Sequence, residues 1–498
     1  MEISQKTYMN NVTHGNLPPK IVIILGVMAY LLVLLSPGNY LFCDPDTLMH
    51  ITAGQWIFDN QAVPAADLFS NSVAGKAWVD HEWLAQLLMY LTVRLGDLAG
   101  LRVLIAVLVG LTFAIELQFL LRRMQPIYAL LFCAITCACL MGHLLARPHV
   151  FTWPIILFWY ATLFNSVEQG RSKPPYLLSL VMILWANLHG SFILGLATIP
   201  FFALESCLLA PKEQRFEISK QWLLFLVLSA AFSLLTPYGL DGLALGANLL
   251  SSDSISRIVE WAPTSGSNLR PIEFWLLLIL SLSLYGNLKL TLARLFLLLG
   301  LMYEAFAHVR YVSIFGLLIP LILAVPFTQF YDTIQKSQLG ASRIDLFFAN
   351  LRKPISTVLL LGLLIFGLSS ALLSQDYQKN QPSELNAPIE ALEAAKEWGV
   401  SGNLLNYWNF GGFLISRNIP VYIDGRADLY GDQHVNEYFV LTDSIDTQKV
   451  ASLLEKRQIT WTMMPPSERI VLYLNNQKDW KKIYEDKNAV VHVKVLKE

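Results

Sequence analysis

The amino-acid sequence predicts a polytopic α-helical membrane protein with a C-terminal soluble α/β domain. Of its 498 residues, 54% are hydrophobic and only 15% are charged, against roughly 25% charged in ordinary soluble domains. The charges are unevenly placed, because residues 376–498 hold 31 of the 73 charged side chains. Both observations predict a transmembrane domain over residues 1–375, followed by a water-soluble domain over residues 376–498.

The net charge separates this chain from proteins that bind nucleic acids. It is −1 at neutral pH, so the sequence lacks the basic excess that attracts a phosphate backbone. We therefore predict no nucleic-acid partner. The partner that the composition indicates is the membrane itself.

Apolar runs predict about eleven membrane spans. They cover residues 21–36, 99–121, 127–145, 150–166, 175–188, 190–209, 222–236, 273–287, 292–307, 312–327 and 355–373. The first is interpreted as a retained signal anchor, because no cleavage site of small residues follows it. Several runs are shorter than the ~20 residues of a typical span, so the count is approximate.

Basic turns between these runs orient the chain. Cytoplasmic loops carry an excess of Lys and Arg, and here the basic turns lie at residues 122–123, 171–173, 212–220, 289 and 336–353. With an odd number of spans, the N-terminus lies in the cytoplasm and the soluble domain lies outside. The sequence thus predicts a multi-pass protein of the plasma (inner) membrane with an external, periplasmic domain.

Residues 37–98 form a long first external loop in this topology, because acidic residues alternate there with large apolar ones. Asp44-Pro45 is a helix-start signal, with Asp as the N-cap and Pro at the first helical position. The following apolar residues predict a helix that lies along the membrane surface. A second helix, over residues 83–95, is also expected to lie in the interface.

The soluble domain alternates helical and extended patterns. Helices are predicted near 388–398, 432–441, 448–457 and 468–475, and strands near 403–407, 421–424, 459–463 and 489–495. Such alternation is typical of a small α/β layer. Asp424 and Arg426 follow a predicted strand end, where such sheets contact ligands. The alternative is that these two side chains pair and hold a turn.

Polar and charged residues at the ends of the apolar runs gather on the external side. They are Asp44, Asp46, Asp80, His81, Glu82, Arg147, His149, His189, Glu260, His308 and Arg310. Interface residues also cap helices or extend toward water. However, ionisable groups beside hydrocarbon are costly and usually mark a site, and their collection on one face favours a functional site.

The side-chain chemistry of this group falls into two kinds. Asp44 and Asp46 stand two residues apart, so both carboxylates can approach one divalent cation, for which oxygen ligands suit Mg or Mn, or one acceptor group. The donors that can clamp a phosphate are Arg147, His149, His308 and Arg310. Carboxylates opposite a phosphate clamp indicate group transfer from a phosphorylated lipid.

Four segments, in this order along the chain, resemble one known family. They are Cys43-Asp44-Pro45-Asp46, the stretch from Arg257 through Glu260 to Thr264, His308-Val309-Arg310-Tyr311, and Tyr407-Trp408-Asn409-Phe410-Gly411. Together they resemble the integral-membrane glycosyltransferases of the GT-C class, in particular the catalytic subunit of oligosaccharyltransferase. The last segment is similar to the WWDYG signature of that subunit.

The resemblance implies an enzyme that transfers a sugar or glycan from a polyprenyl-phosphate-linked donor to a protein, lipid or glycan acceptor on the external face. It assigns Asp44 as the catalytic carboxylate, with Asp46 and Glu260 assisting. Donor-phosphate binding is assigned to Arg310, Arg147 and His308. Acceptor binding is assigned to Tyr407, Trp408 and Asn409.

Two departures from the family pattern concern the acceptor and the metal. Asn409 stands where the family signature has Asp. The segment Ala146-Arg147-Pro148-His149 lacks the acidic pair that the family uses for metal binding. Two cofactor states therefore stay open, namely Mg or Mn held by Asp44 and Asp46, and no metal.

Two other classes of function compete with this interpretation. One is a transporter or flippase for a lipid-linked substrate, although we find no matching inverted halves and expect no charge deep in the spans. The other is a non-catalytic scaffold whose soluble domain binds partners of the cell envelope.

Overall fold

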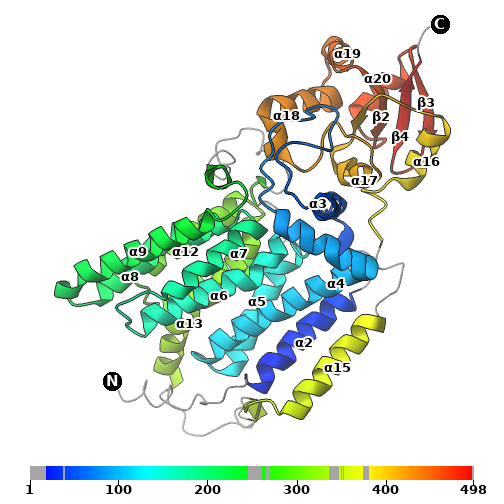
Figure 1. Cartoon of the computed structure of the whole chain (residues 1–498). Coiled ribbons are helices and arrows are strands. Elements are labelled where there is room, and N and C mark those ends of the chain that lie inside the picture. Colours follow the sequence, from blue (N-terminus) through cyan, green and yellow to red (C-terminus); the bar gives the residue numbers. More distant parts are fainter. Residues whose placement is uncertain are drawn as a thin grey trace.

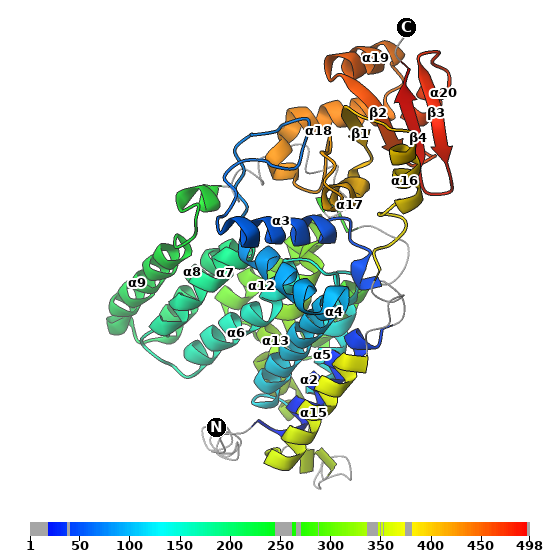
Figure 2. The ribbon, with the colours of Figure 1, turned by 45° about the vertical axis from the view of Figure 1, so that its right-hand side comes forward.

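The protein consists of a large helical bundle and a small α/β domain at one end of it (Figure 1). It was analysed as a computed structural model, which describes residues 18–36, 40–244, 261–264, 270–286, 288–335, 347–348, 350–351, 353–373 and 381–495. The C-terminal domain lies at the end of the bundle opposite the start of α2 (Figures 1 and 2). Residues far apart in sequence therefore meet where the two parts join.

Apolar helices make up the bundle. Their bounds are α2 (Lys20–Leu34), α4 (Trp83–Leu121), α5 (Pro126–Met141), α6 (His149–Glu168), α7 (Val181–Leu188), α8 (Phe192–Leu209), α9 (Arg215–Ser233), α11 (Pro271–Gly286), α12 (Leu292–Ala307), α13 (Tyr311–Gln335) and α15 (Thr357–Leu373), with short 3-10 helices at Tyr40–Phe42, Tyr176–Leu180 and Lys212–Gln214. Buried aromatic side chains fill the space between them, among them Trp153, Trp159 and Trp185.

The helices identify a membrane protein, but the expected span count is not confirmed. In the described part of the chain, five segments are long and apolar enough to cross a membrane: Trp83–Leu121, His149–Glu168, Phe192–Leu209, Lys212–Ser233 and Tyr311–Phe330. Other apolar helices are shorter than 18 residues. The expected separate helices at 83–95 and 99–121 are both present within the element labelled α4, because non-helical backbone at Gly96 and Asp97 divides it into two helices.

The first loop contains α3 (Thr47–Asn60), which lies across the end of the bundle beneath the C-terminal domain (Figure 2). The predicted start of this helix is wrong by two residues, because Asp46 rather than Asp44 precedes its first turn. The Asp44 Oδ1 atom instead accepts a hydrogen bond of 2.8 Å from the Asp46 backbone N–H. This bond turns the chain before the helix and brings both carboxylates to its N-terminal end.

The C-terminal domain has one four-stranded sheet in the order β1-β2-β4-β3. Strands β1 (Asn403–Asn406) and β2 (Ile459–Met464) are parallel, and β4 (Val490–Lys494) runs antiparallel to β2 and to β3 (Trp480–Glu485). The helices are α16 (Ile389–Glu397), α17 (Gly411–Ser416), α18 (Ala427–Asp443), α19 (Thr447–Lys456) and α20 (Arg469–Asn475), with a 3-10 turn at Trp408–Phe410. The small α/β layer is therefore present.

Two details of this sheet differ from the sequence prediction. Residues 421–424 form no strand of the sheet, because Val421 pairs with the backbone of Phe69 and Asn71, and the Asn406 side chain takes the hydrogen bonds of the next two residues. Its Oδ1 accepts from the Tyr422 N–H at 2.8 Å, and its Nδ2 donates to the Ile423 carbonyl at 2.8 Å. The edge strand β3 was not predicted, since its mostly exposed residues lack a clear alternation of apolar and polar side chains.

A buried ion cluster fastens the C-terminal domain to the first loop. The Arg426 guanidinium donates to Asp424 Oδ2 at 2.7 Å and to Asp67 Oδ1, 359 residues away, at 2.8 Å. It also lies over the Trp78 ring, 4.7 Å from its centre. Burial alone would raise the pKa of Asp424, but the charge and hydrogen bonds of Arg426 outweigh it, so that this pKa is lowered. The predicted Asp424–Arg426 pair is thus present, with Asp67 as an unpredicted third member.

Backbone contacts complete this attachment. The Asn71 side chain donates to the Leu404 carbonyl at 3.1 Å, and the Ser72 hydroxyl donates to the Tyr422 carbonyl at 2.6 Å. The end of α3 that carries Pro45 packs closely against α17. At Gly412, a Cβ atom would lie 2.1 Å from the Pro45 carbonyl oxygen, so only glycine fits there.

Charged residues are also buried within the bundle, contrary to the expectation that the spans lack them. Glu116 of α4 is fully buried, and its Oε1 accepts a hydrogen bond of 2.7 Å from Thr136 of α5. At the end of the bundle away from the C-terminal domain, Arg294 pairs with Glu168 at 3.0 Å and with Glu205 at 2.8 Å. These pairs join the ends of α6 and α8 to the start of α12.

Replacement of Arg426 by Ala is expected to destabilise the full-length protein by about 3–5 kcal/mol, because it leaves two buried carboxylates without their cation. Urea unfolding of the purified protein in detergent, followed by tryptophan fluorescence, measures this change. The matched control is Lys487→Ala, which removes an exposed pair with Glu384 and should have little effect. Equal stability of the two variants would show that the buried ion cluster does not hold the C-terminal domain to the first loop.

Candidate active site

A cavity of about 1060 Å³ lies where the bundle meets the C-terminal domain. We call it the site cavity. Its charged and polar lining residues come from the first loop, from the bundle helices and from the C-terminal domain. They include Asp46, His50, Asp80, His81, Glu82, Gln86, Arg147, His189, Ser191, Glu304, Arg310, Tyr407, Trp408, Asn409, Arg426, Asp428, Asp443 and Glu468. Most of the polar residues predicted to share one face therefore do meet in one place.

Arg147 joins the two carboxylates at the start of α3. Its Nη1 lies 3.3 Å from Asp44 Oδ2, and its Nη2 lies 2.9 Å from Asp46 Oδ2. Asp46 and Arg147 line the site cavity, whereas Asp44, which is 6% exposed, lies outside its lining. The structure thus brings these three predicted residues together but turns Asp46, rather than Asp44, toward the cavity.

Glu82 is surrounded by histidines on another wall of the cavity. Its carboxylate lies 3.4 Å from His189 Nε2, 3.8 Å from His81 Nε2 and 3.9 Å from His50 Nδ1. Burial raises the pKa of Glu82, against the opposing charges of His81 and Arg147. Burial also lowers the pKa values of His50 and His189 well below the ordinary range, so these two rings are neutral near pH 7. Glu82 therefore binds a proton more readily than an exposed carboxylate does.

No specific role was predicted for Glu82 and its histidines, although Asp80, His81, Glu82 and His189 are among the polar residues predicted to share the external face. His189 follows α7 after a stretch of more than 100 residues, and no spacing rule connects it with Glu82. Only the packing of α4 against α7 brings them together. The Trp83 ring N–H, which donates to Asn187 Oδ1 at 2.8 Å, holds the two helix ends in contact.

Arg310 enters the cavity at the start of α13, where it lies over an aromatic ring. The centre of its guanidinium is 4.4 Å from the centre of the Trp261 ring. His308 Nδ1 lies 2.9 Å from the Trp261 carbonyl oxygen, and His308 lies outside the cavity lining. His308 thus positions Trp261 and, through it, Arg310. The predicted Glu260 lies outside the described residues.

The C-terminal domain contributes the wall formed by Tyr407, Trp408 and Asn409. These residues follow β1 and enter a 3-10 turn, and all three line the site cavity. The Trp408 N–H donates to the Tyr438 hydroxyl at 3.0 Å, and its ring stacks on Phe439. The three residues predicted to form the acceptor pocket therefore line the same cavity as Asp46, Arg147 and Glu82.

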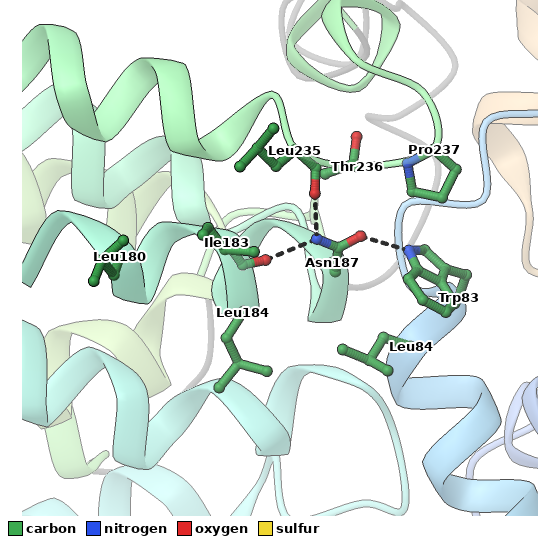
Figure 3. Close-up of a pocket in the computed structure, with 9 residues that line it drawn as sticks. All are labelled: Trp83, Leu84, Leu180, Ile183, Leu184, Asn187, Leu235, Thr236 and Pro237. Carbon is green, nitrogen blue, oxygen red and sulfur yellow. Dashed lines mark hydrogen bonds between the residues drawn. The ribbon is translucent and has the colours of Figure 1, made fainter.

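A second, mostly apolar groove of about 720 Å³ lies beside the contact between Trp83 and Asn187 (Figure 3). Trp83, Leu84, Leu180, Ile183, Leu184, Asn187, Leu235, Thr236 and Pro237 line it. The Asn187 side-chain nitrogen donates to the carbonyls of Ile183 at 2.7 Å and Leu235 at 3.0 Å. The polar atoms of Asn187 are thus occupied within the protein, and most of the other side chains that line the groove are apolar.

The residues present do not fit a divalent cation in this arrangement. Asp44 and Asp46 are the pair expected to hold Mg or Mn, and each contacts the Arg147 guanidinium instead. Among the residues that the structure describes, no three His, Cys, Asp or Glu side chains converge in a geometry that could hold a metal. The positive charge beside these carboxylates therefore belongs to the protein.

Comparison with known proteins connects this fold to one group of enzymes. No protein-family model matches the chain, and no curated protein sequence matches it. Among solved structures it is similar to the Archaeoglobus fulgidus oligosaccharyltransferase tethered to an acceptor peptide containing the NVT sequon, with a TM-score of 0.54, 11% identity, and coverage of 89% of this chain and 68% of that one.

Two further structures of the Archaeoglobus fulgidus oligosaccharyltransferase give the same result. One, with an inhibitory peptide and a dolichol-phosphate, has a TM-score of 0.54 at 10% identity over 89% of this chain and 69% of that one. The other, a complex with Zn and sulfate, has a TM-score of 0.51 at 12% identity over 89% and 68%. The distant resemblance to the oligosaccharyltransferase of the GT-C class is thus confirmed for the fold.

Asp80 is expected to make stability depend on pH. Burial raises its pKa to about 7, whereas an unfolded Asp has a pKa of about 3.9. Because the folded state keeps a proton that the unfolded state loses, this contribution to stability falls as the pH rises from about 4 to 7, and is constant above. Asp80→Asn, which cannot ionise, should therefore lose less stability than the unaltered protein between pH 5 and pH 7 in urea unfolding.

The control for this measurement is Asp59→Asn, since Asp59 is exposed on α3. It should retain the full pH dependence. Identical pH dependence in Asp80→Asn and Asp59→Asn would show that Asp80 is ionised in the folded protein at both pH values.

Proposed function

We propose that the protein is a membrane glycosyltransferase that transfers a sugar or glycan from a polyprenyl-phosphate-linked donor to an acceptor. The observation that carries this proposal is the site cavity. It places a cationic side chain on the bundle, carboxylates at the start of α3, and the aromatic wall of the C-terminal domain around one space. The fold around it resembles that of a solved oligosaccharyltransferase.

The donor side consists of Arg310 and the apolar groove. No carboxylate among the described residues forms an ion pair with Arg310, which leaves its charge for an anionic group in the cavity. Guanidinium binds phosphate through two parallel hydrogen bonds. The groove of Figure 3 begins at Trp83, next to Glu82 of the site cavity, and its apolar lining suits a polyprenyl chain. One of the similar structures contains a dolichol-phosphate.

The acceptor side consists of Asp46 and Glu82 with the wall formed by Tyr407, Trp408 and Asn409. In the proposed step, an oxygen or nitrogen of the acceptor attacks the anomeric carbon of the sugar, and the bond from that carbon to the phosphate oxygen breaks. The acceptor's proton passes to a carboxylate, for which the raised pKa of Glu82 is suited. Arg310 stabilises the charge that develops on the leaving phosphate.

Asp44 takes a positioning role in this scheme. It lies outside the cavity lining and holds Arg147 at 3.3 Å, so it orients the guanidinium and, through the Asp46 N–H, the start of α3. Asp46 is the carboxylate that faces the acceptor. The acceptor class stays as predicted, namely a protein, lipid or glycan, and the similar structure with a tethered peptide is consistent with the first of these.

The proposed orientation puts the site cavity and the C-terminal domain on the external, periplasmic face of the inner membrane. Basic residues at the opposite end of the bundle support it. Arg122 and Arg123 follow the end of α4, and Lys212 and Arg215 precede and begin α9. Excess Lys and Arg indicates the cytoplasmic side.

Arg310→Ala is expected to weaken binding of polyprenyl phosphate, because it removes the only part of the donor side that carries charge in this scheme. Arg310→Lys should retain part of the binding, since Lys keeps the charge but not the planar fork. Native mass spectrometry of the detergent-solubilised protein with undecaprenyl phosphate measures the bound fraction. Unchanged binding in Arg310→Ala would remove this residue from the donor site.

Asp46→Asn is expected to lower transfer by about 10²–10⁴, the range for a positioned acid–base group, because Asp46 orients the acceptor whose proton Glu82 takes. Asp44→Asn should cost less, because it acts through Arg147. Release of polyprenyl phosphate from a lipid-linked sugar extract measures both variants, and size-exclusion profiles establish that they fold. A larger loss in Asp44→Asn would support the direct catalytic role predicted from the sequence, and no loss in either would favour a scaffold or transporter.

A further inference from the structure

The environment of Asp44 and Asp46 resembles a divalent-cation site in which a side chain replaces the ion. Two carboxylates, both less than 8% exposed, face one point at the wall of the site cavity. Carboxylate oxygens in such a pair are the preferred ligands of Mg and Mn. At that point lies the Arg147 guanidinium, which directs one nitrogen to each carboxylate at 3.3 and 2.9 Å.

Neither carboxylate is placed to turn away from Arg147. Asp44 Oδ1 is held by the Asp46 backbone N–H at 2.8 Å, which leaves Oδ2 directed at the guanidinium. On the other side, the Asp46 carboxylate packs against Gly425 of the C-terminal domain, where a Cβ atom would lie 2.1 Å from Oδ1. The backbone of both parts of the protein therefore fixes the two carboxylates around the position that Arg147 occupies.

We propose that Arg147 is a built-in cation that takes the place of a divalent metal at Asp44 and Asp46, so that this site works without a bound metal ion. The guanidinium delivers its charge at the same edge of the cavity and needs no ion from solution. Because its side chain is 20% exposed and lines the cavity, its charge also acts on whatever anionic group occupies the cavity. The position of this cation between two carboxylates does not depend on the proposed function, whereas its role in transfer rests on it.

The proposal predicts that removal of Arg147 creates a metal site. In Arg147→Ala, the two carboxylates keep their backbone supports and lose their cation, which makes them available to Mn²⁺. Electron paramagnetic resonance titration of the purified full-length protein with Mn²⁺ measures the binding. We expect Arg147→Ala to bind Mn²⁺ on the order of tenfold more tightly than the unaltered protein, or tighter still, and Arg147→Lys to exclude it.

Two further variants assign any bound Mn²⁺. Arg310→Ala removes the same charge from the same cavity without touching Asp44 or Asp46, and should bind no more Mn²⁺ than the unaltered protein. Arg147→Ala combined with Asp46→Asn should lose the gained site. Equal Mn²⁺ binding by the unaltered protein and Arg147→Ala, or gained binding that survives Asp46→Asn, would overturn the proposal.

A measurement on the unaltered protein does not depend on whether Arg147→Ala folds. Neither EDTA nor Mn²⁺ should change its thermal unfolding temperature or its release of polyprenyl phosphate. A rise in unfolding temperature with Mn²⁺ that disappears in Asp46→Asn, or transfer that EDTA abolishes and Mn²⁺ restores, would overturn the built-in cation while supporting the glycosyltransferase. If no transfer is found but the Mn²⁺ results are as expected, the proposed glycosyltransferase function would be wrong and the role of Arg147 as a built-in cation would still be supported.

Discussion

The buried Arg426 cluster is the constraint on which the site depends. Its guanidinium joins Asp424 of the C-terminal domain to Asp67 of the first loop, and the loop in turn carries α3 and Glu82. A small domain with a single four-stranded sheet has few ways to hold a fixed orientation on a membrane bundle, and a charge buried between two carboxylates is costly to separate. Tyr407, Trp408 and Asn409 line the same cavity as Asp46, and this cluster holds together the two parts of the protein that supply them.

The three arginines of the cavity occupy different electrostatic environments. Arg426 has two buried carboxylates and the Trp78 ring around it, and it holds structure. Arg147 also meets two carboxylates but reaches the cavity. Arg310 meets the face of Trp261, which stabilises a cation without neutralising it. The attraction of each for a bound anion therefore rises from Arg426 through Arg147 to Arg310, although all three lie within one site.

Composition and charge patterns predicted much of the architecture, and packing decided the rest. The apolar bundle, the small sheet and the collection of polar residues at one end follow from local patterns in the chain. The start of α3 was predicted at the wrong residue, because Asp-Pro is a good helix start in isolation and the Asp44 side chain turned instead to the Asp46 N–H. Glu82 and His189 were predicted to lie on the same face, but their contact with each other and with His50 could not be predicted, since it forms only where α3, α4 and α7 meet. A strand was predicted over residues 421–424, but the Asn406 side chain takes hydrogen bonds that a neighbouring strand would make there.

The long separation between Asp67 and Arg426 also has a consequence for biosynthesis. The two partners are 359 residues apart, so the helices through α15 must be complete before the contact that closes the cavity can form. Contacts of such long range form late, after local structure. A nascent chain that is still being inserted thus has carboxylates and arginines at the membrane surface but no enclosed site. A protein truncated before residue 426 would lack the enclosed cavity, and its Asp67 would lack the cation that Arg426 supplies.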